Sequence, residues 1–188
     1  MIVEERLETV FVYGTLLADE VTKLVLDRVP ASEPAILQGY RRFGIKGRMY
    51  PALAKATAQD SIEGKVLHGI TFHELQILDE YEDDEYYKDT VQVETASGSS
   101  VSAHVYVWQD ALRYKLAGSW SYEGFREHDM EQYLQIHAPF AEEVKVCTSG
   151  EKGVAGAARC FWIAPTSPKS RARILLLSDK QTKTYRLH

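Results

Sequence analysis

The chain has 188 residues, of which 45% are hydrophobic and 26% are charged, and its formal net charge at pH 7 is −5. This length and composition are ordinary for a soluble globular protein with one well-buried core. No run of some 18 apolar residues is present, and the first six residues are too acidic and too weakly apolar for a signal peptide, so we expect a cytosolic protein.

Charge is divided unevenly along the chain. Residues 1–146 hold 14 basic and 25 acidic residues, a net charge of −11, whereas residues 147–188 hold eight basic and two acidic residues, a net charge of +6. Because the acidic body repels nucleic acid, we expect neither a nucleic-acid nor a membrane partner. We predict one domain over residues 1–146 and a divergent, poorly ordered basic tail over residues 147–188, for which a specific basic interaction site is the alternative.

Cysteine and histidine content bears on the class of site. Cys147 and Cys160 are the two cysteines of the chain, so a disulfide framework is not expected. Cysteine and histidine residues are not spaced as they are in zinc sites. We therefore expect no metal and no cofactor.

The hydrophobic pattern predicts a strand-rich domain with a few helices. A short buried strand at residues 10–13 leads through a glycine loop into a helix at residues 19–29, in which Val29 belongs to the apolar stripe. Turn residues separate five further predicted strands, at residues 35–45, 50–56, 62–70, 87–95 and 101–108. This spacing indicates a closed or nearly closed barrel.

Two more helices are predicted. The sequence Thr71-Phe72-His73-Glu74 has the spacing of a capping box, so a helix should begin there and should leave Glu82 just beyond its end. Apolar residues at helical intervals predict a last helix over residues 122–146. Pro139 removes one backbone donor and should kink that helix or divide it in two.

Two segments contain residue types that are typical of ligand-binding or catalytic sites. At residues 11–17 a strand runs into a glycine loop that opens a helix, and the N–H groups of such a loop can bind an oxygen or a carboxylate. At residues 78–86 carboxylates are crowded by one another and by aromatic rings, which can turn one of them into a base. A tight turn and a solvated acidic run are the plain structural explanations, and spacing alone ranks Asp79, Glu82 and Glu85 equally.

Several segments occur in one characteristic order. They are Phe-Val-Tyr-Gly-Thr-Leu at 11–16, residues 39–43 followed by 46–52, residues 64–67, the acidic segment 78–86, and Tyr-Val-Trp at 106–108. In this combination the chain resembles the γ-glutamylcyclotransferase-like proteins, most closely their plant avirulence-induced-gene-like branch. The resemblance covers residues from about 9 to 146.

The resemblance implies both a fold and a reaction. The fold is of the α+β class, a small mixed β-barrel with flanking helices and a pocket at one barrel end. The reaction is an intramolecular acyl transfer on a small γ-glutamyl substrate, in which the α-amine attacks the side-chain carbonyl, closes 5-oxoproline and releases the attached amine or amino acid. Such a reaction needs a base and a site for the oxyanion. The sequence leaves the leaving group and the oligomeric state open.

The same resemblance assigns roles to residues. Glu82 matches the catalytic glutamate, and we expect the like charges of Asp79, Asp83 and Asp84, together with nearby tyrosine rings, to raise its pKa. The expected substrate-binding loop supplies mainly backbone N–H groups, with the Tyr13 hydroxyl as a further contact. Its residues are Tyr13, Gly14, Thr15, Leu16, Leu17 and Ala18.

Other residues and functions stay open at this stage. Tyr106 is either a packing residue, which such a strand pattern favours, or part of the pocket lining, and Arg48 either pairs with a substrate carboxylate or is simply exposed. A non-catalytic descendant that binds a small ligand or a protein in a stress or defence response is the alternative function. A hydrolase with a Ser or Cys nucleophile is weakest, because residues 1–146 contain no cysteine and no serine in a nucleophile-elbow setting.

Overall fold

A computed structural model describes residues 7–148, 159–163, 173–178 and 181–184, with side chains over residues 7–139. The chain divides into two compact units, Met1–Ala141 and Glu142–His188. In the described part of the chain, no helix is both long enough and apolar enough to cross a membrane.

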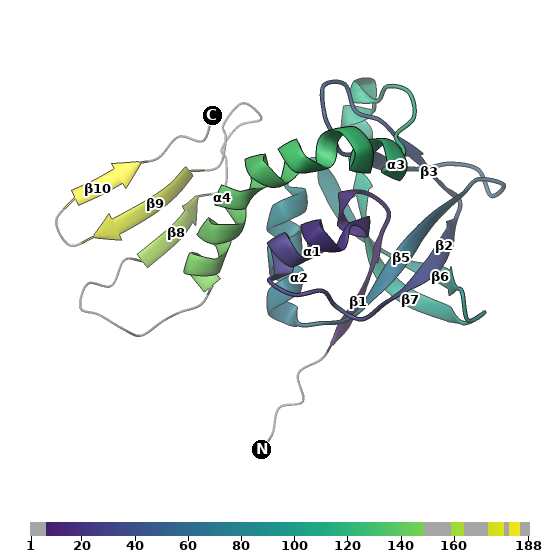
Figure 1. The fold of residues 1–188 in the computed structure, drawn as a ribbon, viewed down its shortest axis with the longest axis horizontal. Helices are drawn as coiled ribbons and strands as arrows, with labels where there is room; N and C mark the ends of the chain where they lie inside the picture. The colour runs from purple at the N-terminus through teal and green to yellow at the C-terminus, as the bar shows by residue number, and fades with distance from the viewer. Residues whose placement is uncertain (1–6, 149–158, 164–172, 179–180, 185–188) are drawn as a thin grey trace, which may run out of the picture. The chain divides into compact units, whose positions relative to one another are not determined.

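The first unit is built around a closed barrel (Figure 1). Around the barrel the strands follow the order β1 (Glu8–Val12), β5 (Ser61–Ile70), β2 (Ser32–Gln38), β6 (Tyr86–Thr95) and β7 (Ser100–Trp108). β1 and β7 pair in parallel at Val10 and His104, while the other neighbouring strands pair antiparallel. The predicted α+β fold with a small mixed barrel is confirmed.

The barrel core consists of inward-facing apolar side chains. A close approach between β1 and β5 makes a glycine necessary, because a Cβ at Gly64 would lie 2.4 Å from the Val12 carbonyl oxygen and 2.5 Å from the Phe11 ring. The largest of the fully buried side chains include Phe11, Leu37, Val66, Val93 and Trp108.

One predicted strand is two strands in the structure. The prediction of a continuous strand over residues 35–45 is wrong, because Gly39 adopts a left-handed conformation with φ of 79° and separates β2 from β3 (Tyr40–Phe43). β3 then pairs antiparallel with β4 (Ala52–Lys55) in a separate two-stranded sheet.

Two helices, α1 (Asp19–Leu26) and α2 (Phe72–Glu82), contact each other and lie side by side next to the barrel in Figure 1. α1 is shorter than predicted, because Asp27 is left-handed with φ of 60° and ends the helix, and Val29 is 45% exposed instead of buried. The capping box at the start of α2 is confirmed. Glu82 is the last residue of α2, one position earlier than predicted, and Asp83 follows with φ of 58°.

The predicted C-terminal helix is divided, but not at its proline. A short 3₁₀ stretch, η2 (Asp110–Lys115), precedes α3 (Tyr122–Gly124), a π-helical stretch (Phe125–Asp129) and α4 (Met130–Thr148). α4 continues through Pro139, so the helix is not divided there, while the predicted kink stays a prediction. Losing one N–H donor is tolerated within a helix of 19 residues.

The second unit contains an antiparallel sheet in the strand order β10 (Gln181–Thr184), β9 (Arg173–Ser178), β8 (Arg159–Ile163). The predicted boundary between residues 146 and 147 falls within α4, and it stays a prediction. So does the poorly ordered state predicted for residues 147–188, most of which lie outside the described residues.

Candidate active site

The first loop, residues 13–18, carries the chain from β1 into α1. It contains one 3₁₀ turn, η1 (Thr15–Leu17), in which the Leu17 N–H donates to the Gly14 carbonyl at 3.0 Å and the Ala18 N–H to the Thr15 carbonyl at 3.1 Å. The N–H groups of Thr15 and Leu16 come before these bonds and have no acceptor within the described residues. They can therefore donate to an oxygen of a ligand.

The side chains of the loop mostly point away from solvent. Leu16 and Ala18 are buried, and the Thr22 hydroxyl bonds to both of their carbonyls, at 2.9 and 3.2 Å. Leu17 is half-buried. Thr22 thus fixes the loop from the side of α1, and the groups that the loop can present to a ligand are mainly backbone groups.

Gly14 is required by space and not by a left-handed backbone. Its φ is −119°, which other residues adopt, but a Cβ there would lie 2.9 Å from Cγ of Pro51. The space beside this glycine is thus limited by Pro51, in the segment before β4.

The Tyr13 hydroxyl is already engaged within the protein. It donates to the main-chain carbonyl of Tyr106 at 2.7 Å, and the Tyr13 carbonyl in turn accepts from Nη1 of Arg42 at 2.6 Å. A ligand could therefore use the Tyr13 hydroxyl as an acceptor, whereas its proton is taken.

Glu82 is the last residue of α2. The side chain is half-buried, and within the described residues the carboxylate has no hydrogen-bond or ion-pair partner. Burial raises its pKa from an ordinary value of 4.5 to about 8. A carboxyl group in this state is a proton acceptor of the strength that a general base needs near neutral pH.

The cause of this raised pKa differs from the predicted one. Like-charged neighbours do not contribute to it, and burial alone does. Asp79 is neutralised by Lys88, whose Nζ lies 2.8 and 2.7 Å from its two oxygens, and it also accepts from the Tyr106 hydroxyl at 2.7 Å. Asp83 and Asp84 are exposed, where water screens their charge.

Five buried or half-buried tyrosines lie close enough to Glu82 for its charge to act on their hydroxyl groups. Burial raises the pKa of each of these five tyrosine hydroxyls, and the nearby negative charge of Glu82 raises each pKa further. Neutral rings of this kind exclude water without supplying a countercharge, which accounts for the basic carboxylate. The five residues are Tyr13, Tyr81, Tyr86, Tyr106 and Tyr133.

Tyr133, from α4, is the member that the sequence analysis did not single out. Its hydroxyl contacts those of Tyr81 and Thr15, so that α4, α2 and the first loop meet beside Glu82. The sequence did contain a signal for this role. Tyr133 lies in the apolar stripe of the helix, and a buried tyrosine, unlike phenylalanine, needs a hydrogen-bond partner for its hydroxyl. Tyr106 is buried in the barrel wall, as the packing alternative predicts, and the Glu82 charge raises its pKa; its place in a pocket lining stays a prediction.

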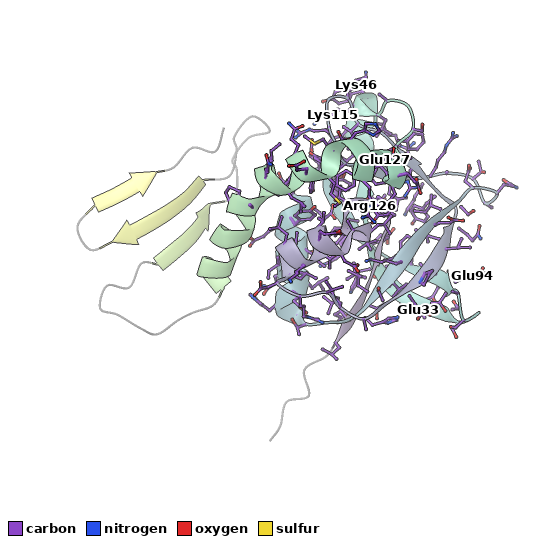
Figure 2. All side chains as sticks on the ribbon, in the orientation of Figure 1. Glu33, Lys46, Glu94, Lys115, Arg126 and Glu127 are labelled. Carbon is purple, nitrogen blue, oxygen red and sulfur yellow. The ribbon has the colours of Figure 1, made fainter. Side chains whose placement is uncertain are left out.

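A cationic group lies close to the same acidic segment. Lys115 and Lys46 are seen near each other at one end of the first unit, away from Glu33 and Glu94 (Figure 2). Lys115 pairs with Glu85 at 2.7 Å, and Arg48 lies 3.8 Å from the same carboxylate and is half exposed. Glu85 is thus neutralised, which removes it as a candidate for the free base.

The described residues contain no group of three or more histidine, cysteine, aspartate or glutamate side chains placed to hold a metal ion. The absence of a cofactor stays a prediction.

Comparison with known proteins places this chain in a family. Residues 10–122 match the family described as γ-glutamyl cyclotransferase, AIG2-like. AIG2-like protein D of Arabidopsis thaliana is 42% identical over 142 residues, which cover 74% of this chain and 93% of that protein. AIG2-like protein C of the same plant is 41% identical over 133 residues, covering 70% and 77%.

Solved structures agree on the fold. The solution structure of an Arabidopsis thaliana protein that is 31% identical aligns with a TM-score of 0.56 and covers 76% of this chain and 95% of that one. A structure titled gamma-glutamyl cyclotransferase, 17% identical, aligns with a TM-score of 0.50 and covers 80% and 94%, a likeness of fold. The chain belongs to the γ-glutamyl cyclotransferase, AIG2-like family.

Proposed function

We propose that this protein is a γ-glutamylcyclotransferase that acts on a small γ-glutamyl amino acid or amine and produces 5-oxoproline and the free amine. The observation that carries the proposal is the Glu82 carboxylate, which is half-buried, lacks a partner within the described residues and has a pKa raised to about 8. Family membership supports the reaction class, since the family description names this activity.

The raised pKa of Glu82 is close to that of the substrate α-ammonium group, whose proton must be removed. The pKa of an α-amino group is about 8, so transfer of a proton from the substrate ammonium to Glu82 costs little free energy. A carboxylate with an ordinary pKa would be too weak a base, and one paired to a cation would be weaker still. Glu82 therefore fits the role of the general base.

Each atom of the proposed reaction is accounted for. Glu82 takes a proton from the α-ammonium, and the freed lone pair of the nitrogen forms a C–N bond to the γ-carbonyl carbon. Glu82 gives this proton to the amide nitrogen, the amide C–N bond breaks and the carbonyl re-forms on the new ring. Glu82 then takes the second proton from the ring nitrogen and passes it to the released amine, which leaves as an ammonium ion. The enzyme ends in its starting state without another reactant.

The first loop suits the developing negative charge. The N–H groups of Thr15 and Leu16 lack acceptors within the described residues, and together they can donate to the carbonyl oxygen as it becomes an oxyanion, or to the substrate α-carboxylate. A Cβ at Gly14 would lie 2.9 Å from Cγ of Pro51, so the loop leaves no room for a side chain at this position.

We also propose that the partner is a small molecule, not nucleic acid or membrane, and that the protein acts in the cytosol. The net charge of −11 over residues 1–146 supports the first part of this proposal.

The direct test is to incubate the purified chain with γ-glutamyl amino acids, γ-glutamyl amines and glutathione and to measure 5-oxoproline. We expect release from at least one of these classes. Glutaryl amides, which lack the α-amine, are the matched control and should yield none. No 5-oxoproline from any γ-glutamyl compound would contradict the proposal and would favour a ligand-binding role.

A further inference from the structure

The carboxylate of Glu85, three residues after Glu82, lies beside two cations. Nζ of Lys115 lies 2.7 Å from one Glu85 oxygen, and Nη2 of Arg48 lies 3.8 Å from the other. The second oxygen also accepts from the Tyr50 hydroxyl at 3.4 Å. Two positive charges and one negative charge leave a local excess of one positive charge. We call Arg48, Glu85 and Lys115 the charge triad.

Arg48 is the cation that the charge triad leaves available. Its distance of 3.8 Å from Glu85 is too long for a hydrogen bond, whereas Lys115 makes the short contact. The Arg48 guanidinium group makes no hydrogen bond to a described residue, so its N–H donors can serve a ligand. The group lies over the Tyr50 ring, with Cζ 5.5 Å from the ring centre, and the side chain is 49% exposed. A ligand carboxylate can therefore reach it from solvent.

The charge triad lies next to the candidate active site. Tyr50, which bonds to Glu85, is followed by Pro51, the residue that limits the space beside the first loop. The Pro51 carbonyl accepts from the Tyr86 hydroxyl at 2.7 Å. Burial raises the pKa of that hydroxyl, and the charges of Glu82 and Glu85 both raise it further. The charge triad and the proposed base therefore lie near the same tyrosine.

We propose that Arg48 binds the carboxylate of the amino acid that the reaction releases, so that the substrate is a γ-glutamyl amino acid and not a γ-glutamyl amine. This inference rests on the proposed function and decides between the two substrate classes that it leaves open. A guanidinium group can donate two parallel hydrogen bonds to one carboxylate. Lys115 has a positioning role, because it neutralises Glu85, which would otherwise pair with Arg48 and repel the ligand.

The test compares two ligands that differ only in the carboxylate of the leaving group, γ-glutamyl-alanine and γ-glutamyl-ethylamide. Their dissociation constants are measured by calorimetry on the Glu82→Gln protein, in which the proposed turnover is blocked. We expect γ-glutamyl-alanine to bind more tightly. Arg48→Gln should reduce this preference by about five- to tenfold, as for loss of a charged hydrogen bond at a half-exposed site.

Two further variants should change the preference in opposite directions. Lys115→Gln should lower it, because Glu85 then pairs with Arg48. Glu85→Gln should raise it, because both cations are then available to the ligand, and adding Glu85→Gln to Lys115→Gln should restore the preference. A purely structural role would not produce changes of opposite sign. These variants also decide the matter if Arg48→Gln does not fold.

Lys46→Gln is the matched control. It removes one positive charge from a residue whose backbone N–H donates to the Lys115 carbonyl at 3.0 Å and whose side chain is seen near that of Lys115 (Figure 2). Lys46 makes no ion pair with Glu85 in the described part of the chain. The preference should therefore stay at the value of the parent protein. An equal fall in Lys46→Gln and Arg48→Gln would mean that only the general positive potential matters, and it would overturn the Arg48 site.

The remaining outcomes separate this inference from the proposed function. Equal affinity for the two ligands, or a preference that Arg48→Gln leaves unchanged, would overturn the Arg48 site even if the wild-type protein releases 5-oxoproline. A preference that depends on Arg48, in a wild-type protein that releases no 5-oxoproline, would support the carboxylate site and contradict the cyclotransferase reaction. Failure of both ligands to bind would overturn both.

Discussion

The hydroxyl of Tyr13 donates a hydrogen bond to the main-chain carbonyl of Tyr106 at 2.7 Å, and the two residues are 93 positions apart in the sequence. Both side chains are buried. This bond ties the start of the first loop to β7, the strand that also supplies the Tyr106 phenol near Glu82.

Tyr13→Phe should therefore destabilise the protein. The substitution leaves the buried carbonyl of Tyr106 without this donor, which costs about 1–3 kcal/mol of unfolding free energy. Urea denaturation measures the change, and the exposed Tyr114→Phe control should stay within about 0.5 kcal/mol of wild type. An unchanged unfolding free energy for Tyr13→Phe would show that the bond contributes nothing net.

Gly14→Val should impair ligand binding more than Thr15→Ser. A side chain at Gly14 meets Pro51 at 2.9 Å, and overpacking of this kind typically costs about 1–3 kcal/mol and moves the backbone. Serine keeps the hydroxyl at position 15. Calorimetry with a γ-glutamyl ligand, alongside circular dichroism, compares the two variants. A folded Gly14→Val protein with unchanged affinity would place the binding site elsewhere.

The Glu82 pKa predicts a pH-dependent stability difference. The folded protein holds a proton up to about pH 8, whereas an unfolded glutamate releases it near 4.5. The stability that this proton contributes is complete below the unfolded pKa and is lost as the pH rises through the folded pKa. Melting temperatures of wild type should consequently fall relative to those of Glu82→Gln between about pH 5 and pH 9. Parallel curves for the two proteins would mean that the carboxylate is not buried as described.

Deletion of residues 150–188 should leave cyclotransferase activity at a rate comparable to that of the intact chain. Each residue assigned to the site lies between Tyr13 and Tyr133, within the first unit. The measurement is 5-oxoproline release by the truncated and intact proteins, together with their melting temperatures. Loss of activity in a folded truncated protein would show that the deleted residues take part in the site.

Local patterns in the sequence predicted the barrel well. Alternating apolar residues indicated the strands, and the capping box at Thr71 indicated the start of α2, because both signals depend on near neighbours in the chain. The break at Gly39 escaped prediction, since the flanking residues continue a strand pattern and only the positive φ reveals the turn.

The environment of Glu82 was harder to predict. Sequence neighbours pointed to aspartates as the cause of its raised pKa, but Lys88 neutralises Asp79 and burial is the actual cause. The bond from Thr15 to Tyr133 spans 118 positions, and no local pattern indicates a contact at that separation. Long-range packing therefore determined the part of the site that the sequence did not reveal.

The measurement that tests the central claim most directly is the rate of 5-oxoproline formation by Glu82→Gln relative to wild type, with a γ-glutamyl substrate of the wild-type protein. Glutamine keeps the shape of the side chain but cannot accept the ammonium proton, so the rate should fall by about two to four orders of magnitude while the protein stays folded. A folded Glu82→Gln protein that turns over near the wild-type rate would contradict the assignment of Glu82 as the general base.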